Sequence, residues 1–222
     1  DRVIAKGSRA LSPAEFEAAA NETEAVILDT RHQSNFIEGF IPQSIFIGID
    51  DAFAPWVGAL IKDVKQPILL VAEAGRVEEV ITRMSRVGFD NTIGYLEGGF
   101  EAWKADNREV DSLRSIPANE FEQEVTENKL PVFDMRKKGE WDSSHLTDAT
   151  HVCLSGINEH LAEFPKDKNF YVHCAGGYRS VIAASILKMR GYHNLTDVAG
   201  GYDAIQTTGL PKREEVCPST LK

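Results

Sequence analysis

The chain contains two similar stretches of sequence about 100 residues apart, and this repeat constrains its fold more than any other feature. Residues 26–31 read VILDTR and residues 131–136 read PVFDMR. Further along, residues 96–103 read LEGGFEAW and residues 198–205 read VAGGYDAI. The repeat is too long for a solenoid unit and has the length of a whole domain. We therefore expect two copies of one domain.

Each copy is expected to be an α/β domain, the first over residues 1–108 and the second over residues 109–222. Short, continuous apolar runs predict strands that are buried on both faces of a parallel sheet. Helical segments lie between them, and Ser12 can cap one helix in which Pro13 occupies the first turn and Glu15 completes a capping box. In such folds, sites lie at the carboxyl ends of strands. The predicted strands cover residues 26–30, 45–49, 68–72, 132–135 and 170–174.

Composition and cysteine usage narrow the function classes. The chain carries 34 acidic and 24 basic residues, for a net charge of −10. An acidic surface repels nucleic-acid phosphates and anionic membranes, so neither is an expected partner. No apolar run reaches the ~20 residues of a transmembrane helix. The three cysteines, Cys153, Cys174 and Cys217, have no C-x-x-C spacing. Their odd number and spacing disfavour a disulfide scaffold and a structural zinc site, and favour a reducing, cytoplasmic location.

One segment has the pattern of a reactive cysteine. Cys174 ends the predicted strand over 170–174, the loop AGGYR follows at 175–179, and a helix is predicted from Ser180. Glycines let successive loop N–H groups converge on one point, while the helix N-terminus and Arg179 add positive charge. These features stabilise a thiolate, so Cys174 is predicted to be a nucleophile. The alternative is a buried, inert cysteine.

The segment HCAGGYRS at 173–180 resembles the active-site loop of rhodanese-family sulfurtransferases. The stretch DMRKKGEWDSSHLTDA at 134–149 is similar to the family's D-x-R followed by E-[FYW] and G-H-I-P-G-A. It departs from that pattern at Ser144, Thr147 and Asp148, which stand where Gly, Pro and Gly are usual. The resemblance extends to a late Gly-Gly-aromatic turn in both copies. It implies two rhodanese-like domains, each a mostly parallel sheet flanked by helices.

The resemblance also implies a reaction. Cys174 would receive a sulfane sulfur from thiosulfate or a low-molecular-weight persulfide, hold it as a persulfide, and pass it to a thiol or cyanide. Arg179 would orient the anionic donor or brace the loop, with a salt bridge to Asp134 or Glu140 as the structural alternative. His173 is expected to pack beside the loop, and no metal or other cofactor is implied within this chain. The residues expected to bind the sulfur substrate are Ala175, Gly176, Gly177, Tyr178 and Ser180.

The first copy keeps the frame of the second but not its chemistry. It contains no cysteine, and its corresponding loop lies within VAEAGRVEE at 71–79. We align Glu73 with Cys174, and a slip of two residues stays open. Because a carboxylate cannot carry a sulfane sulfur, the first copy is expected to be silent in sulfur transfer. Its expected roles are structural support, lining a cleft or binding a partner.

Two other functions stay open. Cysteine phosphatases with a similar layout place five residues between the cysteine and the arginine, whereas four separate Cys174 from Arg179, so the loop favours sulfur transfer. A non-catalytic module that senses sulfane sulfur or anions is the stronger alternative. The tandem also resembles the C-terminal half of metallo-β-lactamase-fold proteins fused to rhodanese domains, which are related to persulfide dioxygenases. That resemblance implies an N-terminal partner domain outside this chain.

The remaining cysteines and two of the histidines carry weaker predictions. Cys153 is expected to pack in the core, with a resolving thiol close to Cys174 as the alternative. Cys217 is expected to be an exposed, incidental thiol. His145 and His151 have no third residue at ligand spacing, so no metal site is predicted there.

Overall fold

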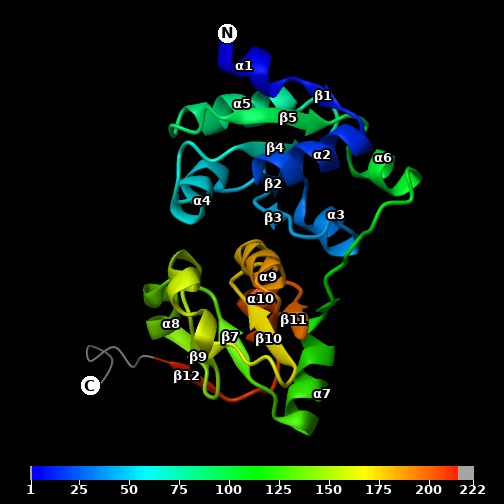
Figure 1. Ribbon diagram of the computed structural model, residues 1–222. Coiled ribbons are helices and arrows are strands. Elements are labelled where there is room, and N and C mark those ends of the chain that lie inside the picture. The colour runs from blue at the N-terminus through cyan, green and yellow to red at the C-terminus, as the bar shows by residue number, and fades with distance from the viewer. Residues whose placement is uncertain (1, 215–222) are drawn as a thin grey trace. The chain divides into compact units, whose positions relative to one another are not determined.

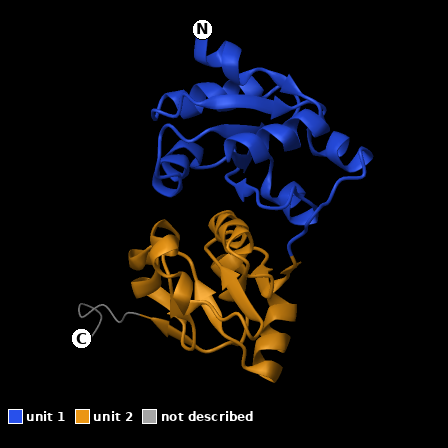
Figure 2. Cartoon of the chain, viewed as in Figure 1, with its two compact units in different colours: residues 1–113 blue, residues 114–222 orange. Residues whose placement is uncertain are grey.

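The computed structural model describes residues 2–214 and divides into two compact units, residues 1–113 and residues 114–222 (Figures 1 and 2). We refer to these units as the first and the second domain. Cys217 lies outside the described residues. Each domain contains a five-stranded parallel sheet with helices packed against it, so the predicted α/β architecture is confirmed.

The first domain forms its sheet in the strand order β1-β5-β4-β2-β3. The strands are β1 (Ala10–Leu11), β2 (Val26–Asp29), β3 (Ile45–Phe46), β4 (Ile68–Val71) and β5 (Thr92–Leu96). The helices are α1 (Arg2–Gly7), α2 (Pro13–Thr23), α3 (Gln33–Glu38), α4 (Phe53–Leu60), α5 (Val77–Ser85) and α6 (Gly99–Ala105).

The second domain repeats this order as β6-β11-β10-β7-β9. Its parallel strands are β6 (Ser115–Ile116), β7 (Val132–Asp134), β9 (Thr150–His151), β10 (Phe170–His173) and β11 (Leu195–Val198). A separate antiparallel pair is formed by β8 (Ser144–Leu146) and β12 (Lys212–Glu214). The helices are α7 (Ala118–Asn128), α8 (Lys138–Ser143), the 3₁₀ segments η1 (Leu154–Glu159) and η2 (Leu161–Glu163), α9 (Arg179–Met189) and α10 (Gly201–Ile205).

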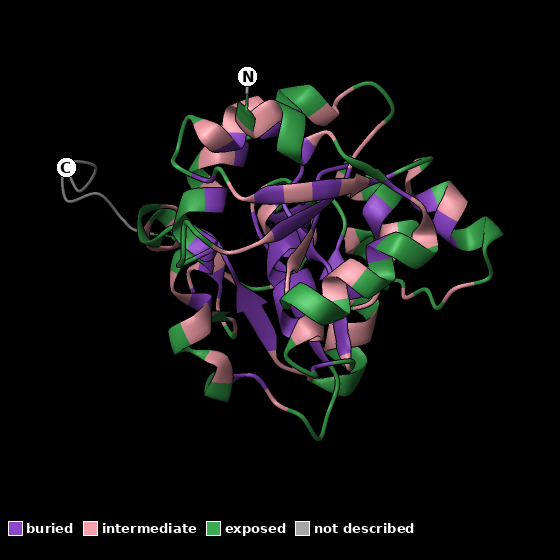
Figure 3. Cartoon of the chain, turned by 45° about the horizontal axis from the view of Figure 1, so that its top comes forward, coloured by how far each residue is buried: buried purple, intermediate pink, exposed green. Residues whose placement is uncertain are grey.

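The central strands are buried along their whole length. All four residues of β4 and all four of β10 are buried, because helices cover both faces of each sheet (Figure 3). This burial explains why the strands read as continuous apolar runs rather than as alternating patterns. The edge strand β3 is shorter than the predicted 45–49, since it pairs with one neighbour, although Ile47 N–H still donates to Asp29 O at 3.0 Å.

The predicted capping box opens α2. Glu15 N–H donates to Ser12 Oγ at 3.3 Å, and Ser12 N–H donates to the Glu15 carboxylate at 2.8 Å. These hydrogen bonds satisfy two of the backbone donors that a helix start leaves free, and the one from Ser12 N–H lowers the pKa of the Glu15 carboxyl group. The helix then buries Phe16 against Trp103, with 6.2 Å between the ring centroids. Among residues 2–214, no helix is both long and apolar enough to cross a membrane.

Candidate active site

Cys174 lies at the carboxyl end of β10, where the backbone turns into α9. Its side chain is 1% exposed and points into the loop that precedes the helix. Gly177 N–H donates to Cys174 Sγ at 3.1 Å, and the Cys174 thiol donates to Ser180 Oγ at 3.4 Å. Gly177 reaches this position with φ = +106°, a conformation that favours glycine. The loop therefore places a backbone N–H and a hydroxyl against one sulfur atom.

The loop carbonyls are held away from that sulfur by the start of α10. Tyr202 N–H donates to Cys174 O at 2.7 Å, and Asp203 N–H donates to Ala175 O at 3.0 Å. Gly201, at φ = +54°, makes this close approach possible, because a Cβ there would lie 2.5 Å from both carbonyl oxygens. With its carbonyls bonded to α10, the loop is free to direct N–H groups toward sulfur, as anion-binding loops do.

Arg179 is held by Glu140 rather than by Asp134. Its two terminal nitrogens donate to the two Glu140 oxygens at 2.7 and 2.8 Å, which is the bidentate geometry of a strong guanidinium–carboxylate pair. The hydrogen bonds from Arg179 lower the pKa of Glu140 to about 2, and the same contact raises the pKa of Arg179. Of the two partners considered from the sequence, the structure shows Glu140, so Arg179 braces the loop against α8.

Asp134 has a different partner. Arg136 makes a two-pronged contact with its carboxylate, with the shortest distance at 2.7 Å, and also donates to Ser144 O at 2.7 Å. The Arg136 guanidinium lies over the Tyr202 ring at 4.0 Å. The D-x-R stretch therefore links the end of β7 to β8 and α10. In this way it supports the loop that carries Cys174. The sequence analysis assigned no supporting role to Tyr202. The signal for it is that Tyr202 is the aromatic residue that follows the Gly-Gly turn.

His173 packs inside the domain beside the loop, as expected. It is fully buried, and desolvation lowers its pKa, so the ring is neutral near pH 7. Its Nδ1 lies 3.1 Å from Cys174 O, whereas its Nε2 has no hydrogen-bond partner among the described residues. The nearest carboxylate oxygen to Nε2, on Asp134, is 3.8 Å away.

The loop residues predicted to bind substrate differ in exposure. Gly176 is exposed and Ala175 is half-buried, so this end of the loop faces solvent. Gly177, Tyr178 and Ser180 are buried. The first half of the loop therefore faces solvent, whereas most of its second half lies inside the domain.

The other candidate residues lie in structural positions. Cys153 is partly exposed and its thiol contacts Ser155 Oγ at 3.3 Å, so the expectation that it packs in the core is wrong. Its chain position, at the start of a 3₁₀ segment rather than inside a strand, explains the exposure. His145 and His151 stack on Trp141, with centroids 3.6 and 5.1 Å away, and each bonds a backbone carbonyl.

Strand register corrects the alignment of the first domain. Asp29 pairs with Val71 across the sheet, and the matching Asp134 pairs with His173. The residue after Val71 therefore corresponds to Cys174. That residue is Ala72, not Glu73, which takes the place of Ala175 instead. The alignment from sequence was wrong by one residue because the first loop contains one glycine and the second contains two.

The two loops have the same length but different side chains. Each helix begins five residues after the position of the cysteine, so Val77 replaces Arg179 and Glu78 replaces Ser180. Gly75, at φ = +78°, keeps the left-handed turn of the second loop. The first domain thus retains the backbone path and lacks the cysteine, the arginine and the hydroxyl.

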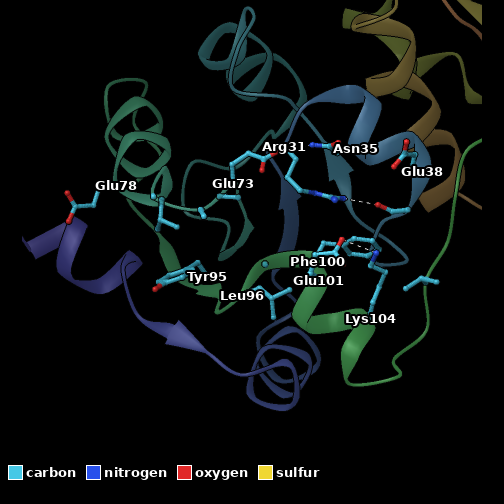
Figure 4. A pocket seen from close by; sticks show the side chains of 18 of the residues that line it. Arg31, Asn35, Glu38, Glu73, Glu78, Tyr95, Leu96, Phe100, Glu101 and Lys104 are labelled. Carbon is cyan, nitrogen blue, oxygen red and sulfur yellow. Dashed lines mark hydrogen bonds and ion pairs between the residues drawn. The ribbon is translucent and has the colours of Figure 1, made fainter.

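A cavity of about 760 Å³ opens over the loop of the first domain (Figure 4). Figure 4 shows Glu73 from the loop directed toward Asn35, whose amide donates to it at 3.0 Å. The lining also includes Arg31, which is paired with Asp29 at 2.7 Å, and Phe100 from the Gly-Gly turn. The same Asp–Arg frame as in the second domain is therefore present, around a cavity whose lining residues include no cysteine.

Comparison with known proteins agrees with this geometry. Among curated relatives, the putative sulfur carrier protein YrkF of Bacillus subtilis is 26% identical over 93 residues, which are 41% of this chain and 50% of that protein. A sulfurtransferase of Allochromatium vinosum is 33% identical over 86 residues, or 39% of this chain and 79% of that protein. The thiosulfate sulfurtransferase GlpE of Pseudomonas syringae is 29% identical over 99 residues, or 45% of this chain and 92% of that protein.

The family model described as Rhodanese-like domain matches the chain twice, over residues 12–106 and 117–208. The two matches fall one in each domain. Because together they cover most of the described residues, the chain belongs to the rhodanese-like domain family and carries that domain twice.

Proposed function

We propose that the chain is a sulfurtransferase that carries sulfane sulfur on Cys174. The observation that supports this most directly is the hydrogen bond from Gly177 N–H to Cys174 Sγ, in a loop whose carbonyls are bonded elsewhere. A thiolate or a terminal persulfide sulfur is stabilised by such N–H donors. The sulfurtransferase names of two relatives point to the same chemistry.

The first half-reaction charges the cysteine. The Cys174 sulfur attacks the outer sulfur of thiosulfate or of a low-molecular-weight persulfide, and the donor's S–S bond breaks. Sulfite or a thiolate leaves with the electron pair of that bond. The new sulfur then lies at the exposed half of the loop, near Ala175 and Gly176.

The second half-reaction transfers the sulfur from Cys174 to an acceptor. A thiol or cyanide attacks the outer sulfur, and Cys174 leaves as a thiolate. Arg179 is part of this machinery because its pairing with Glu140 holds the end of the loop against α8. A loop held in this way needs little reorganisation during the reaction. We assign catalysis to the second domain, which contains Cys174 and Arg179, and no sulfur transfer to the first.

The low-molecular-weight persulfide is the donor that the resemblance to metallo-β-lactamase-fold fusions favours. With that donor, the partner is an N-terminal domain with the metallo-β-lactamase fold, and sulfur transfer takes place in a reducing environment. The alternative function is a module that binds sulfane sulfur or an anion without turnover. One observation favours it, since Cys174 is only 1% exposed. A phosphatase is disfavoured by a loop with four residues between Cys174 and Arg179.

Intact mass spectrometry tests the proposal. The full chain is mixed with excess thiosulfate, and in a second arm with glutathione persulfide, and is then treated with cyanide. A gain of about 32 Da that cyanide removes is the expected result. Peptide mapping should place this sulfur on Cys174. An adduct that forms but is not removed by any acceptor would support the binding module, and no adduct with either donor would overturn the proposal.

A further inference from the structure

Asp203 places an unpaired carboxylate beside the exposed half of the loop that carries Cys174. It lies in the first turn of α10, directly after Tyr202, and it is exposed. Its N–H donates to Ala175 O at 3.0 Å, so its backbone is fixed against the loop. No Lys, Arg or His among residues 2–214 lies within ion-pair distance of the Asp203 carboxylate. Its negative charge therefore has no direct partner in the part of the chain that the structure describes.

The carboxylate stands next to Gly176. A Cβ added to Gly176 would lie 3.9 Å from Asp203 Oδ2. Apart from Gly176 and its chain neighbours, Oδ2 is the only described atom that would lie within 4 Å of that Cβ. Because Gly176 is also exposed, this side of the loop opens to solvent beside Asp203. A small molecule that approaches the loop here comes within contact range of the carboxylate.

The sulfur of Cys174 is close to this opening. Gly177 N, in the peptide bond that follows Gly176, lies 3.1 Å from Cys174 Sγ. Covalent geometry then places Asp203 Oδ2 within about 11 Å of the sulfur. That separation is comparable with the Debye length of about 10 Å at 0.1 M salt, so the carboxylate acts on the charge of an approaching donor. Cys174 itself is 1% exposed, and the route that the loop offers to its sulfur passes the exposed Gly176.

The two arginines that support the loop do not offset this charge. Arg179 is engaged by both oxygens of Glu140, at 2.7 and 2.8 Å. Arg136 is paired with Asp134 at 2.7 Å. Each pair is neutral as a unit, so neither cancels the negative charge of Asp203.

The first domain has a cation at the corresponding place. The Gly-Gly turns align Asp203 with Glu101, in the first turn of α6. Glu101 forms an ion pair with Lys104 at 2.9 Å (Figure 4). In the second domain, the neutral Gln206 occupies the position of Lys104. The acidic residue is therefore common to both turns, whereas the uncompensated charge accompanies the cysteine.

We propose that Asp203 selects the sulfur donor by charge: it disfavours dianionic thiosulfate and favours a low-molecular-weight persulfide that carries an ammonium group close to its S–S bond. This inference rests on the proposed sulfur transfer and names its substrate class. The carboxylate attracts the ammonium group and repels the two negative charges of thiosulfate. Asp203 is a specificity-determining residue in this scheme, since it acts on the charge of the donor and takes no part in the bonds that form and break.

The sulfur chemistry is the same for every donor. Cys174 Sγ bonds to the outer sulfur, the donor's S–S bond breaks, and the amine-bearing thiolate leaves with the electron pair of that bond. The ammonium group neither gains nor loses a proton in this step. Asp203 therefore affects how readily a donor reaches the loop, and its effect is expected in kcat/KM for loading.

Single-turnover loading of the full chain with three donors tests the inference. The donors 2-aminoethyl persulfide and 2-hydroxyethyl persulfide are matched in size and differ by one positive charge, and thiosulfate carries two negative charges. At about 10 mM salt, the wild type should load from the aminoethyl donor about 3-fold faster than from the hydroxyethyl donor, and Asp203→Asn should lower that ratio to about 1. Loading from thiosulfate should become about 10-fold faster in Asp203→Asn. Both effects should shrink at about 0.5 M salt.

Asp167→Asn is the matched control. It removes an exposed carboxylate that precedes β10, at the opposite end of that strand from Cys174, and it should change neither rate. Donor ratios that are equal in the wild type and Asp203→Asn would overturn the inference while leaving sulfur transfer intact. A difference that persists at high salt would also overturn it, because Asp203 would then act through the shape of the turn rather than through its charge.

A second measurement separates the inference from the proposed function. If the wild type takes up no sulfur from any donor, the proposed function fails on its own, and alkylation of Cys174 then tests the role of Asp203. Iodoacetate and iodoacetamide differ by one negative charge, and peptide mass mapping measures their rates at Cys174. Asp203→Asn should raise the ratio of the iodoacetate rate to the iodoacetamide rate about 3-fold. An unmoved ratio, or a Cys174 that neither reagent modifies, would refute the inference.

Discussion

The two domains differ where chemistry is expected and agree where the fold requires it. Both have the same strand order, and both tie a buried aspartate to the arginine two residues later. Both arginines also donate to a backbone carbonyl, of Gly39 in one domain and Ser144 in the other. The comparison teaches that the D-x-R stretch serves the fold, because it is intact in a domain that has no cysteine.

The Gly-Gly turn shows a second difference. In the second domain, a Cβ on Gly201 would lie 2.5 Å from two loop carbonyls, whereas in the first domain a Cβ on Gly99 would come no closer than 3.7 Å to Ala72 O. The turn therefore packs tightly on the loop that carries Cys174 and stands away from its counterpart. The cavity of the first domain opens in the space between this turn and the loop.

The largest expected effect separates the domains by chemistry. Cys174→Ser should abolish the cyanide-labile sulfur adduct, since no other group replaces the thiolate. Cys153→Ser should leave most of the adduct, because Cys153 lies outside the loop at 174–179 and its thiol contacts Ser155. Adding Ala72→Cys to Cys174→Ser should not restore transfer, because Val77 and Glu78 replace the arginine and the hydroxyl. Mass spectrometry of the wild type and the three variants checks this, and sulfur uptake by the double variant would show that the backbone of the loop alone suffices.

The next largest effect tests whether both domains depend on the buried Asp–Arg pair for their stability. Asp134→Asn and Asp29→Asn each leave a buried arginine without its carboxylate. Each should reduce the free energy of unfolding of its own domain by about 3–5 kcal/mol. Urea unfolding followed by hydrogen exchange measures the two domains separately. A cost confined to the second domain would break the comparison, because the Asp–Arg pair would then not be a shared requirement of the fold.

A smaller effect concerns the glycine turns. Gly201→Ala and Gly99→Ala both place a Cβ at positive φ, which costs about 1 kcal/mol each. Gly201→Ala should cost about 1–3 kcal/mol more, since the Cβ would collide with two loop carbonyls. It should also slow sulfur loading, whereas Gly99→Ala should not. Thermal unfolding and single-turnover loading check both statements. Equal costs would mean that the turn yields easily in the second domain.

Much of this comparison was accessible from the sequence. The repeat, the apolar runs and the capping box of Ser12 identified the domains, the parallel strands and one helix start, because these depend on local pattern. The alignment of the first-domain loop with the Cys174 loop could not be read from the sequence. Shifting it by one residue leaves the pattern of apolar residues and glycines almost unchanged. Glu73 was therefore aligned where Ala72 belongs. The partner of Arg179 stayed open between Asp134 and Glu140, because the choice depends on a contact between α8 and α9, which lie far apart in sequence.

The smallest effect sharpens the role of Arg179. Its partner Glu140 has a folded-state pKa of about 2, below its ordinary value of 4.5, so the ion pair stabilises the protein above pH 4.5. That contribution is lost as the pH falls from 4.5 through about 2. Because Glu140 is partly exposed, Glu140→Gln should reduce the free energy of unfolding at pH 7 by no more than about 1 kcal/mol.

The difference between the wild type and Glu140→Gln should therefore shrink toward zero as the pH approaches 2. Chemical denaturation at a series of pH values measures it, with Glu97→Gln as an exposed-carboxylate control. In the first domain, Asn35 occupies the position of Glu140 and Val77 that of Arg179, so no charge-dependent pair is available there. A pH-independent difference would contradict the ion pair, and it would equally exclude the helix-start hydrogen bond from Lys137 N–H, because that bond also lowers the pKa of Glu140.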